Sequence, residues 1–428
     1  MTETTGHPNR RDILKQIAIG TAATILPLPA LAQAGNARVV VIGGGFAGAT
    51  CARALKRLSP KLTVTLVETN PTFVACPFSN MVIVGLRPLT MQQFGYESLG
   101  RGGVEIRISP AASVNPETHV VTLADGSRLS YDRLVVAPGV DLRWDGLPGY
   151  TEDAAQIMPH AWKAGEQTTL LAKQLNAMPD GGLVVISAPA NPFRCPPGPY
   201  ERASLIAGYL KKNKPKSKLI ILDAKDAFSK QKLFENAWKE LYPGLIEWVP
   251  LSGGGKVTSV DPAGMTLVTE FSSYKAAVAN VIPPQRAGLI AQIAGVSDRT
   301  GWCPIDPVTF ESLLQPHIHV IGDAAIAGAM PKSAFAANAQ AKVCAQAIVT
   351  LLAGDQPMPP KLINTCYSLV APDYGITVAG VYHPVGGQLV DVADAGGISP
   401  LDASRLFREQ EAKYADGWFK TITADVFG

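Results

Sequence analysis

The clearest hydrophobic pattern in the chain is an apolar run, Arg38–Ile42, that leads into the glycine-rich turn GGGFAG and then into an alanine-rich segment. A continuous apolar run closed by glycines predicts a buried parallel strand, and the alanine-rich segment predicts a helix. A second apolar run, LTVTLVE, ends at Glu68 and predicts the next strand. Together these segments predict a strand–turn–helix–strand unit.

The glycines of this turn have the spacing of a dinucleotide-binding loop. Gly43, Gly45 and Gly48 fit the pattern G-x-G-x-x-G, which allows the tight turn, the close approach of a pyrophosphate and the close packing of helix on strand. The N-terminus of the following helix favours the phosphate charge. Glu68 lies where an acidic side chain can accept hydrogen bonds from an adenosine ribose. The unit therefore predicts a dinucleotide site.

Two later segments indicate which dinucleotide is expected. VVTLADGSRLSYDRLVVAPGV predicts a hairpin turning at Asp125-Gly126 and a following strand, and HIHVIGDAAIAG predicts a strand closed by Gly322 and Asp323. After a G-x-G-x-x-G start, these elements resemble the flavoproteins with two dinucleotide-binding domains. In that superfamily the late Gly-Asp strand end contacts the ribityl and pyrophosphate region of FAD. The resemblance implies that Gly322 and Asp323 bind FAD and that the first site holds FAD rather than NAD.

The middle third of the chain has a strand–helix–strand pattern of its own: GLVVISAP, a helix around Glu201–Leu210, and SKLIILDA. In NADH-using relatives, the loop after the first of these strands carries a second glycine motif. Here the loop reads APANPFRC, and its prolines lack the backbone N–H donors that a pyrophosphate would need. We predict that this domain keeps its fold and has lost its NAD site.

These patterns predict an α/β protein with two Rossmann-like dinucleotide-binding domains and a C-terminal α+β interface domain. The FAD-binding domain is expected to comprise residues 35–149 and 282–356, with the second domain, residues 150–281, inserted between them. Resemblance to flavoproteins of this kind implies that residues 357–428 cover the flavin and contact a partner. Residues 1–34 are interpreted as an export signal.

The first residues have the layout of a twin-arginine export signal. Arg10 and Arg11 precede a moderately apolar segment and an Ala-x-Ala end, and we expect cleavage after about Ala34. The alternative is an N-terminal membrane anchor, but the apolar stretch is short and contains two prolines. No other stretch reaches the ~18 consecutive apolar residues of a membrane helix. We expect a periplasmic protein without stable membrane insertion.

Composition excludes some other classes of partner and site. With 428 residues, of which 47% are hydrophobic and 17% charged, the chain is long enough for two or three domains with large cores. A formal net charge of +3 does not favour a nucleic-acid partner. Of six histidines, only His317 and His319 are close in sequence, so no metal site is predicted.

The six cysteines are not equivalent. They are Cys51, Cys76, Cys195, Cys303, Cys344 and Cys366. No C-x-x-C-H motif is present, so a haem would have to belong to another subunit. Cys51 and Cys344 lie in alanine-rich helical segments and are expected to be buried apolar residues. Cys303, in GWCPID, is interpreted as structural.

Cys76, Cys195 and Cys366 are each expected in a loop-like setting, near a turn or a strand end. Cys195 lies among prolines in FRCPPGPYE, and the adjacent Arg194 could stabilise a thiolate there. From the residue types alone, a structural disulfide between two of the three remains an alternative.

At these residues the chain resembles the flavoprotein subunit of flavocytochrome c sulfide dehydrogenase, a relative of the sulfide:quinone oxidoreductases. The resemblance covers nearly all of the chain after the leader. Its most specific blocks are PHAWKAGEQT, PFRCPPGPYERAS, IPPQRAG, GWCPID, MPKS and NTCYS.

The resemblance implies roles for individual residues. It implies that Cys76 carries FAD through a thioether, that Cys195 and Cys366 form a redox-active disulfide above the flavin, and that Glu201 lies near this disulfide. Two blocks depart from the family pattern: ACPFSN stands in place of TCYLSN, and Phe335 stands where the family has a tyrosine. The cysteine of the first block is kept.

The implied activity is oxidation of hydrosulfide to zero-valent sulfur or polysulfide. Hydrosulfide would attack the disulfide, and electrons would pass through FAD to the haem c of a cytochrome subunit in a heterodimer. One alternative is a sulfide:quinone oxidoreductase, although the last residues are highly charged for a membrane-contacting surface. Another is a non-enzymatic exported flavoprotein, such as a redox chaperone or an electron-carrier scaffold, in which the cysteine pair is structural.

Overall fold

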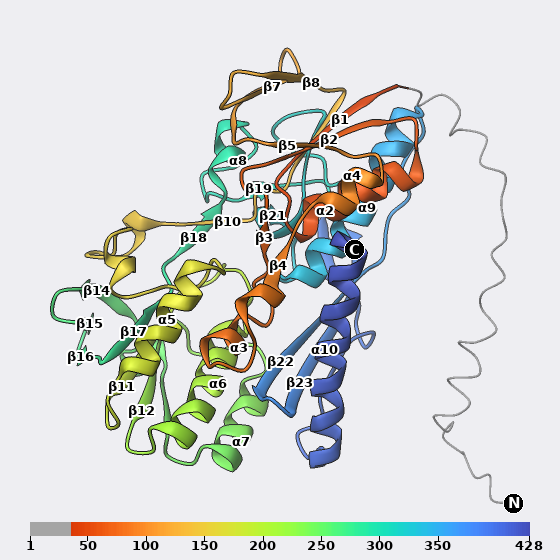
Figure 1. The fold of residues 1–428 in the computed structure, drawn as a ribbon. Coiled ribbons are helices and arrows are strands. Elements are labelled where there is room, and N and C mark those ends of the chain that lie inside the picture. Colours follow the sequence, from red (N-terminus) through yellow and green to blue (C-terminus); the bar gives the residue numbers. More distant parts are fainter. Residues whose placement is uncertain (1–35) are drawn as a thin grey trace, which may run out of the picture.

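The computed structural model describes residues 36–428, so the predicted export signal lies outside the described residues (Figure 1). The first apolar run forms β1 (Arg38–Ile42), the middle strand of a five-stranded parallel sheet in the order β20-β9-β1-β2-β5. The other strands are β2 (Thr63–Glu68), β5 (Glu105–Ile108), β9 (Arg133–Val136) and β20 (Ile318–Val320). The last strand comes from far along the chain, so this sheet is built from two separated segments.

Two helices pack against each other beside this sheet. They are α2 (Phe46–Leu58), which follows the glycine-rich turn, and α9 (Ala334–Leu352), which follows the last strand. Both are rich in alanine, and their alanines share one buried core with the valines of β1. Small side chains let the two helices approach closely, because little volume separates their backbones.

A second parallel sheet lies between the two segments of the first in sequence. Its order is β13-β12-β11-β17, with strands β11 (Leu183–Ala188), β12 (Lys218–Asp223), β13 (Ile246–Val249) and β17 (Val278–Val281). Its helices are α5 (Glu166–Ala177), α6 (Gly198–Asn213) and α7 (Gln231–Leu241). A small antiparallel sheet, β14 (Val257–Asp261), β15 (Thr266–Thr269) and β16 (Ser273–Lys275), precedes β17.

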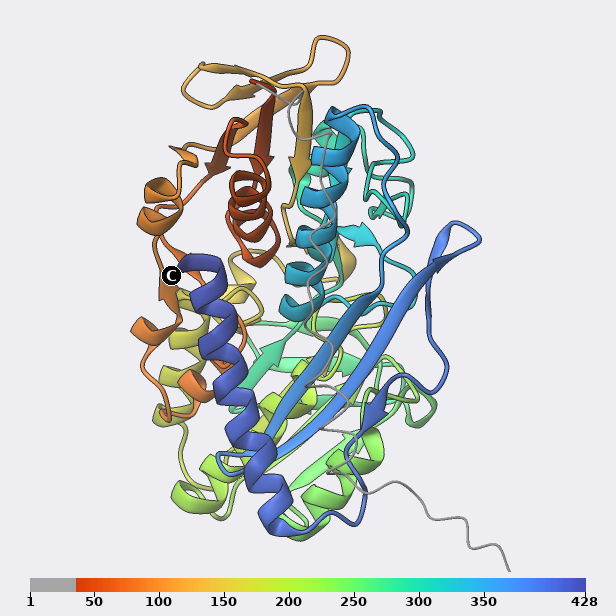
Figure 2. The same ribbon diagram turned by 90° about the vertical axis from the view of Figure 1, so that its right-hand side faces the viewer.

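The C-terminal region joins the two sheets. Its antiparallel strands are β22 (Leu362–Ala371), β23 (Tyr374–Val385), β24 (Gln388–Asp391) and β25 (Gly397–Ile398). Helix α10 (Arg405–Phe427) runs beside β22 and β23 (Figure 2). Ala412 and Ala415 of this helix belong to the core of the second sheet, whereas Phe419 and Phe427 belong to the core of the first. One helix therefore packs against both domains.

Shorter elements complete the described chain. The helices are α3 (Ser79–Ile83), α4 (Glu97–Arg101) and α8 (Leu289–Ile293); the strands are β3 (Phe73–Val74), β4 (Gln93–Phe94), β6 (Ala111–Asn115), β7 (Val120–Leu123), β8 (Arg128–Ser130), β10 (Val140–Leu142), β18 (Gln285–Ala287), β19 (Cys303–Pro304) and β21 (Ala325–Ile326). Among residues 36–428, no helix has both the length and the apolar character needed to cross a bilayer.

The predicted fold class is confirmed: the protein is α/β, with two Rossmann-like sheets and a C-terminal α+β region. The expected setting of one cysteine is wrong. Cys366 does not lie in a loop; it lies within β22, paired with Val378 of β23. This long strand was missed because its register is set by pairing with β23 and by burial against α10, neither of which is visible in a local pattern.

The glycine-rich turn shows why its third glycine is needed. A Cβ atom on Gly48 would lie 1.8 Å from the carbonyl oxygen of Gly43 and 3.2 Å from the side chain of Val41. The first contact is with backbone, which cannot rotate away as a flexible side chain could. Helix α2 can therefore lie this close to β1, and the turn can keep its shape, only because residue 48 has no side chain.

We predict that Gly48→Ala opens the turn, destabilises the protein by about 1–3 kcal/mol or more, and lowers the flavin content of purified protein. The measurements are denaturant unfolding and the ratio of flavin to protein absorbance. Gly100→Ala is the matched control, because a Cβ there meets nothing within 4 Å and Gly100 lies in helix α4. Equal stability and flavin content in the two variants would contradict the packing argument.

Candidate functional site

A cavity of about 840 Å³ is lined by residues from both dinucleotide-binding sheets and from the C-terminal region. This volume lies in the usual range for a cofactor or ligand site. Its lining includes Gly43, Gly45, Glu68, Cys76, Cys195, Glu201, Gly322, Asp323 and Cys366. Nine of the ten predicted site residues thus meet in one space, and the tenth, Gly48, shapes its turn.

At one end of the cavity, the glycine-rich turn and Glu68 are joined directly. The backbone N–H of Gly44 donates to Oε2 of Glu68 at 2.6 Å, and the N–H groups of Thr69 and Asn70 donate to Oε1 at 2.8 and 3.1 Å. Gly43 has φ +101°, and a Cβ there would lie 2.3 Å from the carbonyl oxygen of Ala137. The turn keeps a bare backbone surface that a pyrophosphate can approach.

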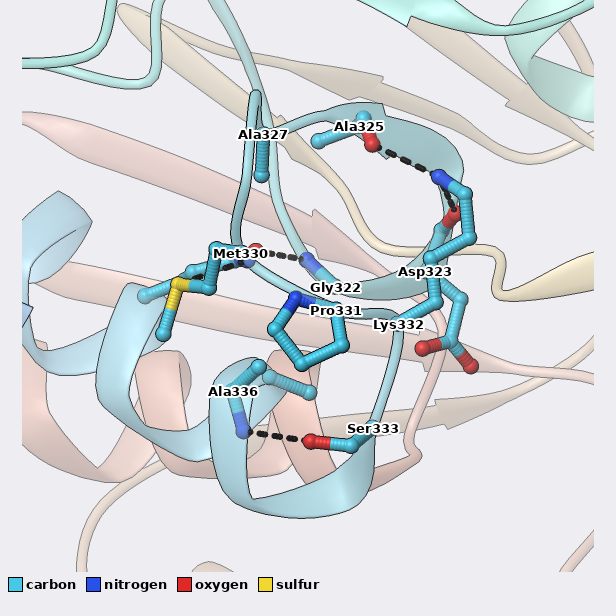
Figure 3. Close-up of a pocket in the computed structure, with 11 residues that line it drawn as sticks. Gly322, Asp323, Ala325, Ala327, Met330, Pro331, Lys332, Ser333 and Ala336 are labelled. Atoms are coloured by element: carbon cyan, nitrogen blue, oxygen red, sulfur yellow. Dashed lines mark hydrogen bonds between the residues drawn. The ribbon is translucent and has the colours of Figure 1, made fainter. Parts of the chain in front are cut away.

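The Gly322–Asp323 strand end forms another part of the lining, next to the loop that leads into α9 (Figure 3). Lys332 donates from its ammonium to the carbonyl oxygens of Asp323 and Ala325 at 2.7 and 2.8 Å, which fixes the strand end. Burial raises the pKa of Asp323, against the opposing effects of Arg194 and Lys332. Its Oδ1 is buried and has no hydrogen-bond partner among the described residues.

These features fit FAD. The unpartnered carboxylate oxygen of Asp323 requires a donor, and the hydroxyl groups of a ribityl chain are such donors. The bare turn at Gly43 and Gly45 suits the pyrophosphate, and Glu68 lies where a ribose would be. The cavity then continues to the cysteines, where an isoalloxazine ring would lie beside them.

Cys76 faces a loop that is held by two buried guanidinium groups. Its Sγ lies 3.6 Å from the carbonyl oxygen of Trp162, and Arg194 donates to the same oxygen. Arg202, only 2% exposed, donates to the carbonyl oxygens of His160 at 2.9 Å and Ala161 at 2.6 Å. Both cations therefore position the loop next to Cys76.

Cys195 has an unusual backbone conformation. Its φ is +56°, which is uncommon for a residue other than glycine, and two prolines follow it. Its N–H donates to the carbonyl oxygen of Lys332 at 2.9 Å, and its own carbonyl accepts from Gly198 at 2.8 Å. A Cβ on Gly198 would lie 2.7 Å from Trp162 and 3.1 Å from Sγ of Cys195. The thiol is held against the N-terminus of α6, which favours negative charge.

Cys366 is approached by a lysine. The ammonium of Lys230 lies 3.9 Å from Sγ of Cys366 and donates to the Cys366 carbonyl oxygen at 2.9 Å and to Oγ of Ser368 at 2.8 Å. Glu201, in the first turn of α6, lies near the same group. Burial raises the pKa of Glu201 to about 7, while Lys230 and a hydrogen bond with Asn80 oppose this rise.

All six cysteines are thiols in this structure. Cys195 and Cys366 line the same cavity, and burial raises the pKa of both thiols. Their pairing as a disulfide and the covalent link at Cys76 stay predictions.

Cys51, Cys303 and Cys344 are fully buried, as expected for structural residues. Burial raises the pKa of Cys303 to about 12. Phe335, which stands where the family has a tyrosine, stacks on Trp418 with ring centroids 6.2 Å apart, and both rings line the cavity.

In the second domain, aromatic and charged side chains occupy the region where a second nucleotide would be expected. Asp223, at the end of β12, is fully buried and accepts hydrogen bonds from Tyr200 at 2.5 Å, Trp248 at 2.9 Å and Lys225 at 2.6 Å. Lys225 also lies over the ring of Phe193 at 4.9 Å. Unlike Glu68, Asp223 is fully buried and does not line the cavity, so a ribose cannot reach it. In residues 36–428, no cluster of three or more potential ligands could hold a metal ion.

Sequence reasoning missed several residues of the site. Trp162 and His160 lie within the block PHAWKAGEQT, which was noted as specific without a role for these side chains. Arg202 and Lys230 resemble the surface cations of ordinary helices in sequence. Nothing in the local pattern signals their burial, because it arises from segments far apart in the chain.

Three family models match the chain. "Sulfide dehydrogenase [flavocytochrome c] flavoprotein chain, central" matches residues 168–283, and "Flavocytochrome c sulphide dehydrogenase, flavin-binding" matches residues 358–427. "Pyridine nucleotide-disulphide oxidoreductase" matches residues 37–176. Each matched range contributes residues to the cavity lining, which also includes residues of 321–337, outside all three ranges.

Individual relatives agree with these matches. A sulfide dehydrogenase [flavocytochrome c] flavoprotein chain from Chlorobaculum thiosulfatiphilum is 58% identical over 48 residues, which is 11% of this chain and 100% of the relative's sequence. A mitochondrial sulfide:quinone oxidoreductase from Mus musculus is 24% identical over 335 residues, 75% of this chain and 72% of the relative. The solved sulfide:quinone oxidoreductase from Aquifex aeolicus has the same fold, with a TM-score of 0.71, 19% identity, and coverage of 91% of this chain and 92% of that one.

We predict that NADH does not reduce the flavin at a useful rate, because the loop after β11 lacks glycines and Asp223 is fully buried beneath its partners. The measurement is anaerobic mixing of the protein with excess NADH while flavin absorbance is followed. Dithionite serves as the positive control for reducibility. Rapid bleaching by NADH alone would show that the second domain still binds a nucleotide.

Proposed function

The chain belongs to the family of flavocytochrome c sulfide dehydrogenase flavoprotein chains, which are sulfide-oxidising flavoproteins, and from this premise we propose that it oxidises hydrosulfide through the pair Cys195–Cys366 and bound FAD. We further propose that its electron acceptor is a c-type cytochrome subunit, bound as a heterodimer. Sulfur would leave as zero-valent sulfur or polysulfide.

One observation supports this proposal more than any other. Cys195 and Cys366 line the same cavity as Cys76 and the residues that fit FAD, although the two cysteines are 171 positions apart in the numbered sequence. A structural disulfide would need no cofactor beside it. A redox pair does, since its electrons must be passed on.

The proposed reaction starts from the oxidised pair. The sulfur of hydrosulfide attacks Sγ of Cys195, a new sulfur–sulfur bond forms, and the Cys195–Cys366 bond breaks. Cys195 then carries a persulfide and Cys366 a thiolate, so sulfide has been oxidised by two electrons and the disulfide reduced. A second hydrosulfide can then take the outer sulfur from Cys195 as a hydrodisulfide anion, which leaves both cysteines reduced. Re-formation of the Cys195–Cys366 disulfide releases two electrons, for which bound FAD would supply the acceptor.

Glu201 is suited to take up the persulfide proton. Burial raises its pKa to about 7, so near neutral pH the carboxyl is present in both forms and exchanges a proton readily. Arg194, the residue before Cys195, adds positive charge that attracts the substrate anion. Its guanidinium also donates to Trp162, so Arg194 both holds the loop and contributes charge.

We also propose that the protein acts in the periplasm after twin-arginine export. Support comes from the paired Arg10 and Arg11 ahead of an apolar segment and an Ala-x-Ala end. This compartment also suits a c-type cytochrome partner and an oxidised cysteine pair.

The proposed flavin link at Cys76 gives a direct test. Acid precipitation of wild-type protein is expected to leave the yellow colour with the polypeptide, and Cys76→Ser is expected to release flavin into the supernatant. Cys303→Ser is the control, since its thiol is fully buried away from the cavity. Free FAD in the wild-type supernatant would disprove the covalent assignment.

The proposed reaction is tested by anaerobic titration with sulfide while flavin absorbance is followed. Wild-type flavin should bleach, and a c-type cytochrome should then re-oxidise it. Cys366→Ser is expected to abolish both the bleaching and any thiolate-to-flavin charge-transfer band, because Cys366 is proposed to lie nearer the ring. Cys195→Ser should retain the band and lose turnover.

Other outcomes have distinct meanings. If Cys195→Ser loses the band and Cys366→Ser keeps it, the two roles are reversed. If both variants turn over sulfide normally, the pair is structural and the reaction is wrong. Re-oxidation by a soluble quinone and not by cytochrome c would identify the chain as a sulfide:quinone oxidoreductase.

A further inference from the structure

Lys230 is a buried cation that has no role in the reaction proposed above. It is 6% exposed, and it adopts a left-handed backbone conformation, φ +61° and ψ +26°, as the residue before helix α7. This turn directs the side chain away from solvent and toward β22. Lysine is rarely buried to this extent without a carboxylate partner or a specific role.

The partners of its ammonium group are mostly neutral. They are the carbonyl oxygens of Cys366 and Ile376, at 2.9 and 3.4 Å, and Oγ of Ser368 at 2.8 Å. Sγ of Cys366 lies 3.9 Å away. Within residues 36–428, no carboxylate forms a salt bridge with Lys230. The hydrogen bonds hold the ammonium close to the sulfur, and in this part of the chain its charge has no directly paired anion.

We propose that Lys230 is the counter-ion of the Cys366 thiolate, so that cleavage of the cysteine pair places the negative charge on Cys366 and the sulfane sulfur on Cys195. This inference rests on the proposed function and assigns a direction to its first step. The bond that forms joins the hydrosulfide sulfur to Cys195, and the bond that breaks leaves its electron pair on Cys366. The leaving thiolate departs faster when it is stabilised.

Other charged groups near Cys366 do not replace Lys230. Glu201 of α6 disfavours negative charge on either thiol, and Tyr382 of β23 is close enough to Cys366 for charges on the two groups to repel. Arg194 acts on Cys195. Lys230 acts on both thiols, but of the two it is hydrogen-bonded only to Cys366. Both effects that oppose burial at Cys366 come from Lys230, one through its charge and one through a hydrogen bond.

The test measures the pH dependence of Cys366 in protein that carries bound flavin. In a Cys195→Ser background, the rate of alkylation of Cys366 by iodoacetamide is followed by mass spectrometry across pH. Lys230→Gln keeps a hydrogen-bond donor and removes the charge. It should raise the midpoint pH by about 1 to 3 units, as expected for loss of an opposite charge within 4–6 Å. Lys230→Arg should restore most of the shift.

Lys232→Gln is the matched control, because Lys232 is exposed in the first turn of the same helix. An unchanged midpoint in Lys230→Gln, or an equal shift in Lys232→Gln, would overturn the proposal. If Lys230→Gln does not fold, Lys230→Met carries the same expectation and leaves no polar group unpaired.

A second measurement needs no variant at position 230. Wild-type protein is mixed with one equivalent of sulfide, quenched with iodoacetamide and digested. The extra sulfur should be found on the Cys195 peptide, and the Cys366 peptide should be alkylated without it. Extra sulfur on Cys366 would contradict the proposed direction. Absence of sulfur from both peptides would instead refute the proposed function, while the pH test of Lys230 would still stand.

Discussion

The arrangement of the site depends on one buried guanidinium group, that of Arg202. It donates to Asn80 of α3 at 3.0 Å, to Asn280 of β17 at 2.8 Å, and to two carbonyl oxygens of the loop that carries Trp162. These partners belong to the flavin-domain side, to the second sheet and to the connection between them. Because a buried polar group left without a partner typically costs about 1–3 kcal/mol, and more when it is charged, these hydrogen bonds hold the three segments together.

The second dinucleotide-binding domain has kept its fold while its nucleotide site has been replaced. Where a ribose-binding acid would be free, Asp223 is bonded to Tyr200, Trp248 and Lys225. The ring of Tyr200, in the first turn of α6, stacks on Phe228 with centroids 3.6 Å apart. This packing makes the loop before α6 rigid, and the same loop presents Cys195 to the cavity. The second domain thus holds the Cys195 thiol in place. A thiol needs a fixed backbone at this loop, whereas a nucleotide would need backbone N–H groups that are free to donate.

Local constraints explain which parts of the site could be predicted from the sequence. Gly43, Gly48 and Gly322 are visible because a turn or a close contact leaves no room for a side chain, and such demands appear within a few residues. Cys366 and Lys230 are 136 positions apart, and their contact requires α7 of the second domain to pack on β22 of the C-terminal region. The hydrophobic periodicity of either segment does not reveal that the two residues are in contact. Cys366 was placed in a loop for the same reason, since the strand around it exists only through its pairing with β23.

The charged side chains around Cys195 and Cys366 together favour anions over neutral groups, and no single residue would produce this preference. Arg194, Arg202 and Lys230 carry three positive charges, and Asp323 and Glu201 are the acids that face them. Burial raises the pKa of Glu201 to about 7, so the negative charge of Glu201 is partly lost near neutral pH. Burial also raises the pKa of Asp323, whereas the guanidinium groups stay charged. The region therefore carries net positive charge under the conditions in which hydrosulfide is an anion. This positive charge attracts a small anion and stabilises a cysteine thiolate against the effect of burial. It does not stabilise a neutral thiol. In this way the positive charge favours both the binding of the proposed substrate and the product of its first step.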